Sequence, residues 1–329
     1  MTRQRCFALT IVTIFVTTIF VLGFHTPYLC AQAYPNRTIN LVVPYPQGDG
    51  TDIAGRLMAD ELAKTLKVPV VVLNKPGAAG TVGTAFVAKA KSDGYTILLA
   101  PTAPIIYSKA RNPAAVPYDP FKDLTPLGVT TVTPMLLVIR SDAPYATFKE
   151  MLEYAQKNPG KLRFGTAGVG STGEFNLRII KAVTGLDVTI VPFEGGAPAV
   201  TAVMDGRVEA APITLPVVAS DLRDKKIKGI LISSKFSEFP DIPTLKQLGY
   251  QQDLLGNWYG CYGPAALPVE VKEALSSAIE KVVKDPTLSA KMTQLGMVQG
   301  FELPDKLLAR MQEEYKTVEG ITKNSKDAK

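Results

Sequence analysis

The sequence of 329 residues holds little of the chemistry that most enzymes use. It contains one histidine, three cysteines and one tryptophan. His25, Cys6 and Cys30 all fall within the first 33 residues, so the rest of the chain has no histidine and a single cysteine, Cys261. Beyond residue 33 these absences exclude an intramolecular disulfide, a Ser–His or Cys–His catalytic pair, and a zinc site built from histidine and cysteine.

An excess of charge of one sign is also lacking. The chain has 36 Lys and Arg against 30 Asp and Glu, a net charge of +6. Two of the basic residues and none of the acidic ones lie in residues 1–33, which leaves +4 for the remainder. No cluster of Lys and Arg interleaved with aromatic residues occurs, so the composition does not favour a nucleic-acid partner.

The N-terminal segment has the order of parts that is typical of a secretory signal peptide. Arg3 and Arg5 precede an uncharged apolar run over residues 7–24, and Ala31-Gln32-Ala33 follows it. We expect cleavage after Ala33 and a periplasmic location. An uncleaved anchor is the alternative, because the run approaches the ~18–20 residues that span a bilayer, and a lipidated Cys30 is a third possibility. Residues 34–329, 296 in all, suffice for two medium-sized domains.

Short apolar, β-branched segments alternate with helical patterns along this part of the chain. Strands are expected at residues 39–44, 68–73, 96–100, 162–166, 188–191, 208–213 and 227–232. A capping box at Thr147 and Glu150 starts a helix to about Lys157, and later helices begin near Pro268 and Pro304. The pattern predicts an α/β fold of two similar halves with mostly parallel sheets, and a cleft at the carboxyl ends of the strands.

The sharpest local motif is the glycine-rich turn Gly168-Val169-Gly170-Ser171-Thr172-Gly173, which lies between an expected strand and an expected helix. It matches G-x-G-x-x-G, and Glu194 lies about 20 residues further on, so a dinucleotide site is one interpretation. The other is a carboxylate site, because free N–H groups at a helix N-terminus hold any small anion. An exported protein does not readily retain a dissociable nicotinamide cofactor, so we expect no cofactor.

The loop after the first strand has the same design, with Gly48, Gly50, Thr51 and Asp52 ahead of a helix. Asp52 or Thr51 is as well suited to capping that helix as to binding a ligand. The glycine-containing loop at residues 74–83 lacks the Lys-Ser/Thr pair of a P-loop and is interpreted as structural.

Four acidic residues, Asp49, Asp52, Glu174 and Glu194, fall near the expected cleft. They allow three interpretations: a carboxylate pair for hydrolysis, a site for a hard cation, or helix caps and solvated loop residues. Cys261 is expected to be a buried small residue, and Trp258 fits either the core or a wall of the cleft.

Several segments together resemble the Bug (TctC-like) family of extracytoplasmic receptors, over essentially the whole chain beyond the signal peptide. The matching segments are Tyr34-Pro35, 43–52 (VPYPQGDGTD), 74–78 (NKPGA), 93–96 (DGYT), 117–120 (PYDP), 166–172 (TAGVGST), 191–199 (VPFEGGAPA), 240–244 (PDIPT) and 256–258 (GNW).

The resemblance implies a two-lobed periplasmic-binding-protein fold of type II, with residues 34–133 and 256–329 in one lobe and 134–255 in the other. Such lobes close around a ligand by rotating about a hinge. The ligand carboxylate is then held between residues 45–52 and 166–172 by backbone N–H groups and ordered water. The residues implied to contact ligand are Tyr45, Gln47, Gly48, Asp49, Thr51, Asp52, Thr102, Thr166, Ala167, Gly168, Gly170, Ser171, Thr172, Phe193, Thr214 and Trp258.

The resemblance further implies a monomeric receptor without catalytic residues, metal or cofactor, whose partners are a small organic acid and the large and small membrane subunits of an ion-coupled transporter. A ligand-sensing subunit for a membrane kinase and an extracytoplasmic hydrolase are the alternatives. The family pattern commonly has Gly, His and a basic residue where Asp49, Glu174 and Glu194 stand. Each departure makes the cleft more acidic, which favours monocarboxylates, zwitterions or neutral amides over a tricarboxylate.

Overall fold

The computed structural model describes residues 34–324, so the expected signal peptide and its cleavage site lie outside the described residues. From Arg37 onward, the described residues form one compact unit that contains two β-sheets. Within residues 34–324, no helix has both the length and the apolar character that crossing a bilayer needs.

The first sheet has six strands in the order β11-β4-β10-β3-β1-β2. They are β1 (Ile39–Val43), β2 (Val70–Asn74), β3 (Thr96–Pro101), β4 (Leu124–Thr133), β10 (Asn257–Pro264) and β11 (Val298–Glu302). The second sheet has the order β7-β6-β8-β5-β9. Its strands are β5 (Met135–Arg140), β6 (Arg163–Thr166), β7 (Thr189–Pro192), β8 (Ala210–Thr214) and β9 (Ile227–Ile232).

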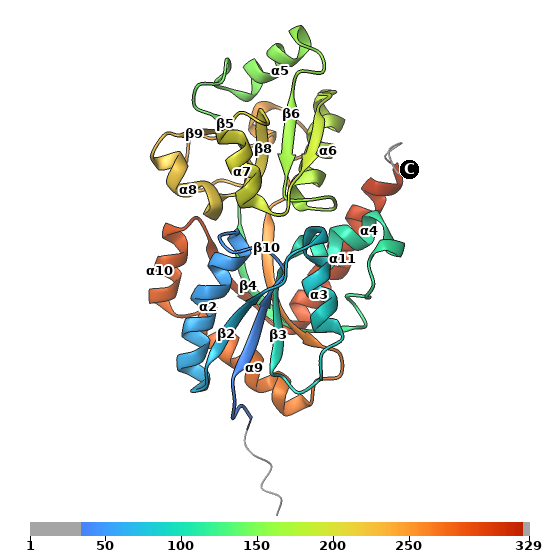
Figure 1. Ribbon diagram of the computed structural model, residues 1–329, viewed down its shortest axis with the longest axis vertical. Coiled ribbons are helices and arrows are strands. Elements are labelled where there is room, and N and C mark those ends of the chain that lie inside the picture. Colours follow the sequence, from blue (N-terminus) through green and yellow to red (C-terminus); the bar gives the residue numbers. More distant parts are fainter. Residues whose placement is uncertain (1–33, 325–329) are drawn as a thin grey trace, which may run out of the picture. The chain divides into compact units, whose positions relative to one another are not determined.

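The helices surround these sheets in two groups, which we call the first and second lobes with their respective sheets (Figure 1). The first group is α2 (Gly50–Leu66), α3 (Thr81–Ala88), α4 (Ser108–Arg111), α9 (Val269–Val283), α10 (Pro286–Gln294) and α11 (Pro304–Asn324), with the short turns η1 (Ala78–Gly80), η2 (Ala103–Tyr107) and η3 (Pro113–Ala115). The second is α5 (Phe148–Lys157), α6 (Thr172–Thr184), α7 (Gly196–Met204), α8 (Leu215–Arg223) and η4 (Lys246–Leu248). The two-lobed α/β fold is therefore as expected.

The sheets are mixed, which corrects the expectation of mostly parallel sheets. In the first sheet β1 runs parallel to β2 and β3, but β10 is antiparallel to β3 and β4, and β11 is antiparallel to β4. In the second, β6 is parallel to β7 and β8, whereas β5 is antiparallel to β8 and β9. The chain leaves the first sheet at Pro134, between β4 and β5, and returns to it as β10.

The second sheet is covered on both faces, and its interior strand β5, between β8 and β9, is apolar at almost every position. Leu137 and Ile139 face one core cluster with residues of α5 and α6, while Leu136 and Val138 face another with residues of α7 and α8. Successive side chains of a strand point to opposite faces, so an unbroken apolar run serves two cores at once. Each fully buried aliphatic side chain contributes about 1.5–3 kcal/mol to this packing.

Candidate functional site

The β1–α2 loop is held by its own acidic side chains. Asp49 has an extended backbone and is the N-cap of α2, where its Oδ1 accepts the Thr51 N–H at 3.0 Å. The expected caps, Thr51 and Asp52, lie instead in the first turn of the helix. An extended residue one position before the helix can direct its carboxylate at the free N–H groups, which residues already in helical conformation cannot do.

Asp52 ties this loop to the neighbouring strand β2. It is buried, accepts the Gly48 N–H at 3.0 Å and the Asn74 side-chain amide at 2.8 Å, and pairs with Arg56 at 2.9 Å. Burial alone would raise its pKa, but the bonds from Arg56, Gly48 and Asn74 outweigh burial and lower the pKa of the Asp52 carboxyl. Its position makes it a support of the loop, away from the cavities described below.

The second oxygen of Asp49 reaches the other lobe. Oδ2 accepts the N–H of Gly196, the first residue of α7, at 3.0 Å. The side chain is only 7% exposed, and burial raises the pKa of the Asp49 carboxyl, against the lowering effect of the Thr51 and Gly196 hydrogen bonds. One carboxylate thus caps helices of both lobes, which places Asp49 inside the cleft and not on its outer surface.

The glycine turn between β6 and α6 forms as the motif predicts. Gly168 and Gly170 have φ of +114° and +83°, and Ser171 caps α6 by accepting the Glu174 N–H at 3.2 Å. The carboxylate of Glu174 itself accepts the Gly170 N–H. An N–H that a phosphate would need is therefore already occupied by a side chain, which weakens the dinucleotide interpretation.

Glu174 links the lobes at a second point. Its Oε1 lies 3.3 Å from Nε of Arg111 in α4 and 3.1 Å from an Nη atom of Arg178, one turn further along α6. Two guanidinium groups thus share one carboxylate, and one of them belongs to the first lobe.

Two cavities adjoin these loops and share Tyr45 and Ala167 in their walls. The outer cavity has about 500 Å³ and is lined by Tyr45, Pro46, Gly77–Thr81, Ser108, Arg111, Asn112, Ala115, Val116, Ala167–Gly170 and Pro192–Gly195. The inner cavity has about 30 Å³ and is lined by Tyr45, Asp49, Thr51, Pro101, Met135, Ala167, Ser171–Gly173, Gly196, Pro212–Thr214 and Asn257. The β1–α2 and β6–α6 loops therefore face each other, as predicted.

Most residues expected to contact ligand line one of these cavities. The outer one holds Gly168, Gly170 and Phe193, the inner one Asp49, Thr51, Ser171, Thr172 and Thr214, and both hold Tyr45 and Ala167. The other six line neither cavity: Gln47 and Gly48 are exposed on the loop, Asp52 faces Arg56, Thr102 and Thr166 are buried behind the walls, and Trp258 lies in the core. Thr102 acts indirectly, since its hydroxyl donates at 2.5 Å to Oδ1 of Asn257, which also accepts from Thr172 at 3.3 Å.

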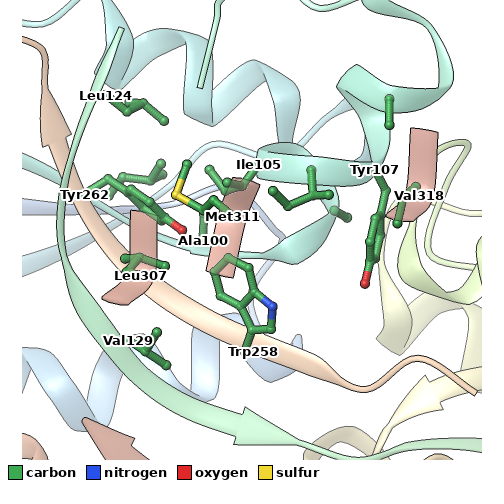
Figure 2. Close-up of a cluster of buried hydrophobic side chains, with 14 of the residues drawn as sticks. Ala100, Ile105, Tyr107, Leu124, Val129, Trp258, Tyr262, Leu307, Met311 and Val318 are labelled. Carbon is green, nitrogen blue, oxygen red and sulfur yellow. The ribbon is translucent and has the colours of Figure 1, made fainter. Parts of the chain in front are cut away.

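Trp258 belongs to the core and lines neither cavity. Figure 2 shows its indole among Tyr262, Leu307 and Met311, in a cluster to which α11 contributes. It is 4% exposed, and its Nε1 donates to Glu314 at 2.6 Å. The side chains of a strand alternate between faces, and at this position of β10 the side chain points to the α11 side.

The site also contains residues that sequence reasoning missed. The loop interpreted as structural contributes Ala78 and Ala79, whose φ values of +46° and +51° are uncommon for alanine, and Tyr45 donates from its hydroxyl to the Ala79 carbonyl at 3.0 Å. Ser108 and Arg111 come from α4, a helix without a local sequence signal. The alanines between two glycines at residues 77–80 were the available clue.

The four acidic residues do not form a metal or hydrolytic centre. Within residues 34–324, no group of three or more His, Cys, Asp or Glu side chains is placed to hold a metal ion. Asp49 accepts two backbone N–H groups, Asp52 and Glu174 pair with arginines, and Glu194 is exposed at the rim. Caps and ion pairs account for three of the four.

Comparison with known proteins agrees with this geometry. Residues 54–324 match the model of the tripartite tricarboxylate transporter family receptor, TctC. The chain is 27% identical to the protein BugT of Bordetella pertussis over 320 residues, which cover 96% of this chain and 97% of BugT.

Solved structures of similar proteins have the same fold. The periplasmic binding protein BugD is 30% identical with a TM-score of 0.82, over 88% of this chain and 98% of BugD. MatC from Rhodopseudomonas palustris, solved with bound malate, is 29% identical with a TM-score of 0.82, over 88% of this chain and all of MatC. The chain therefore belongs to the TctC family of tripartite tricarboxylate transporter receptors, and is a solute-binding receptor and not an enzyme.

Proposed function

We propose that the protein captures a small carboxylate in the cleft between its two lobes and presents it to the membrane subunits of a tripartite transporter. The observation that carries this is the pair of cavities with walls from both lobes, the β1–α2 loop on one side and the β6–α6 loop on the other. Strand-to-helix loops of two facing α/β lobes are a common place for a small-molecule site. The bound malate of MatC supports a carboxylate ligand.

The finer features are part of the same proposal. The lobes are divided at residues 133/134 and 255/256, and the ligand contacts are those residues of the expected set that line the two cavities. Residues 1–33 are a signal peptide removed after Ala33, the mature protein works in the periplasm, and it binds its ligand as a monomer. Mass spectrometry of the exported protein and sedimentation at several concentrations test the cleavage site and the monomeric state.

A thermal-shift screen tests the function directly. The exported protein is heated with each of a panel of mono-, di- and tricarboxylates, amino acids and amides. A ligand at a hundredfold above its Kd adds about 2.7 kcal/mol to the free energy of unfolding, which gives a readily measured shift. Chromatography after long incubation should return the ligand unchanged. The absence of any shift across the panel, or conversion of the ligand, would contradict the proposal.

A further inference from the structure

The inner end of the cleft already contains a carboxylate that belongs to the chain. Asp49 accepts the N–H of Thr51 from α2 and the N–H of Gly196 from α7, both at 3.0 Å, and is 7% exposed. The N-termini of two helices from opposite lobes thus converge on one fixed negative charge. Asp49 occupies the place where these two N–H groups would otherwise bind an anionic head of a ligand.

The space beside Asp49 is small. The inner cavity has about 30 Å³, against about 500 Å³ for the outer one, so it admits only a small ligand head. A carboxylate head is bulkier than an ammonium or a hydroxyl, and it brings a charge of the same sign as that of Asp49. Two like charges about 5 Å apart at an effective dielectric of about 20 lower a binding constant by more than a hundredfold, and by about tenfold after generous screening.

The wall of the outer cavity contains groups that can bind an anion, in contrast to the carboxylate in the inner cavity. Ser108 is 8% exposed, and its Oγ has no hydrogen-bond partner among residues 34–324. Arg111 lines the same wall one turn along the chain, and its partner Glu174 is also paired with Arg178. Of these three ionised groups, only Arg111 lines the cavity, so the wall itself presents a guanidinium there. Glu194 is the only other charged residue among the described residues that line this cavity, and it is exposed at the rim.

We propose that the cleft selects monocarboxylates that carry an ammonium or hydroxyl group at their far end. The carboxylate lies at Ser108 and Arg111, and the ammonium or hydroxyl head points to Asp49, directly or through water. Asp49 is then the specificity-determining residue that excludes dicarboxylates. This inference rests on the proposed function, because it assumes that the cleft captures an organic acid.

Calorimetric titration of ligands of equal length tests which chemical group the cleft prefers at the end of the ligand near Asp49. The probes are glutarate, 5-aminopentanoate and 5-hydroxypentanoate, together with the corresponding four- and six-carbon sets. In the chain length that fits, the amino and hydroxy acids should bind at least about tenfold more tightly than the dicarboxylate. Asp49→Asn, which keeps an acceptor for the helix N-termini, should reduce that ratio to below about threefold. Asp49→Ser is the second uncharged variant, because serine is also a good N-cap.

Two arginine variants separate ligand contact from lobe support. Arg111→Gln should weaken all three probes about equally, by about tenfold, the loss of one charge-assisted hydrogen bond. Arg178→Gln is the matched control, since Arg178 pairs with the same carboxylate of Glu174 but does not line the cavity. It should leave the affinities within about threefold.

The outcomes separate the inference about Asp49 from the proposed receptor function. Tighter binding of the dicarboxylates by the unmodified protein, a ratio that Asp49→Asn leaves unchanged, or equal losses in the two arginine variants would overturn the inference while the receptor function stands. Binding of none of these probes, or of any acid in the wider thermal-shift panel, would overturn the proposed function itself.

Discussion

Gly170 provides the sharpest test of how the lobes meet. It has φ of +83°, and a Cβ built there would lie 3.0 Å from Oγ, 3.5 Å from Cα and 3.6 Å from Cβ of Ser108 in the first lobe. Gly170→Ala has two separate effects. A left-handed backbone costs a non-glycine residue about 1–2 kcal/mol in the free energy of unfolding. Overpacking against Ser108 costs about 1 kcal/mol or more in addition, and only where the lobes are in contact.

Gly160→Ala is the matched control for this substitution. Gly160 has φ of +73°, lies in the second lobe, and has nothing within 4 Å of a built Cβ. Both variants should lose stability in urea, Gly170→Ala by about 1 kcal/mol or more beyond Gly160→Ala. Only Gly170→Ala should lose affinity, by about fivefold or more for the acid that gives the largest thermal shift. Equal affinities in the two variants would refute the view that this glycine turn closes directly onto α4.

Three further predictions concern the supports of the site. Glu314 accepts hydrogen bonds from the Tyr107 hydroxyl at 2.5 Å and from Trp258 at 2.6 Å. Glu314→Ala should therefore lower the free energy of unfolding by about 2–4 kcal/mol, measured by fluorescence of the single tryptophan, and a loss below about 1 kcal/mol would contradict this. The folded state lowers the pKa of Asp52 below its ordinary value of 3.8, so the stability from this group is present above pH 3.8 and is lost as the pH falls through the lowered value. Asp52→Asn should therefore be less stable at pH 7, and its stability should fall less steeply in acid; an unchanged fall in acid would count against this. Burial raises the pKa of Cys261 to about 12, so thiol reagents at pH 8 should modify it only at the rate of unfolding, and rapid labelling of the native protein would show the strand to be open.

Local patterns in the sequence predicted those parts of the fold whose causes are local. The capping box of Thr147 and Glu150 forms, with both reciprocal hydrogen bonds present. The glycine turn at residues 168–173 lies between a strand and a helix, as its spacing indicates. Cys261 is fully buried, as expected of a small apolar residue. In each case the neighbours along the chain supply the groups that determine the conformation.

Other features depend on partners far along the chain and could not be predicted. Asp49 and Gly196 are 147 positions apart, so no local pattern reveals that one caps the helix of the other. Three possible caps within four residues, Asp49, Thr51 and Asp52, made the local choice ambiguous. Strand β5 (MLLVIR) was not predicted, because its Met and Leu residues suit a buried helix as well as a strand, and the periodicity of a short apolar run does not tell the two apart.

The position of β10 has a consequence for the order of folding. Its eight residues are all buried, and it lies between β3 and β4, which end more than 120 residues earlier in the chain. The second sheet consists of residues between 135 and 232, so it can assemble from one contiguous stretch, whereas the first sheet stays divided until residue 264 is available. Contacts between distant segments form slowly. When the chain is synthesised or exported from its N-terminus onward, the second lobe should therefore form first. The part of the ligand site that the first lobe contributes should form only after β10, in the last quarter of the sequence, has become available.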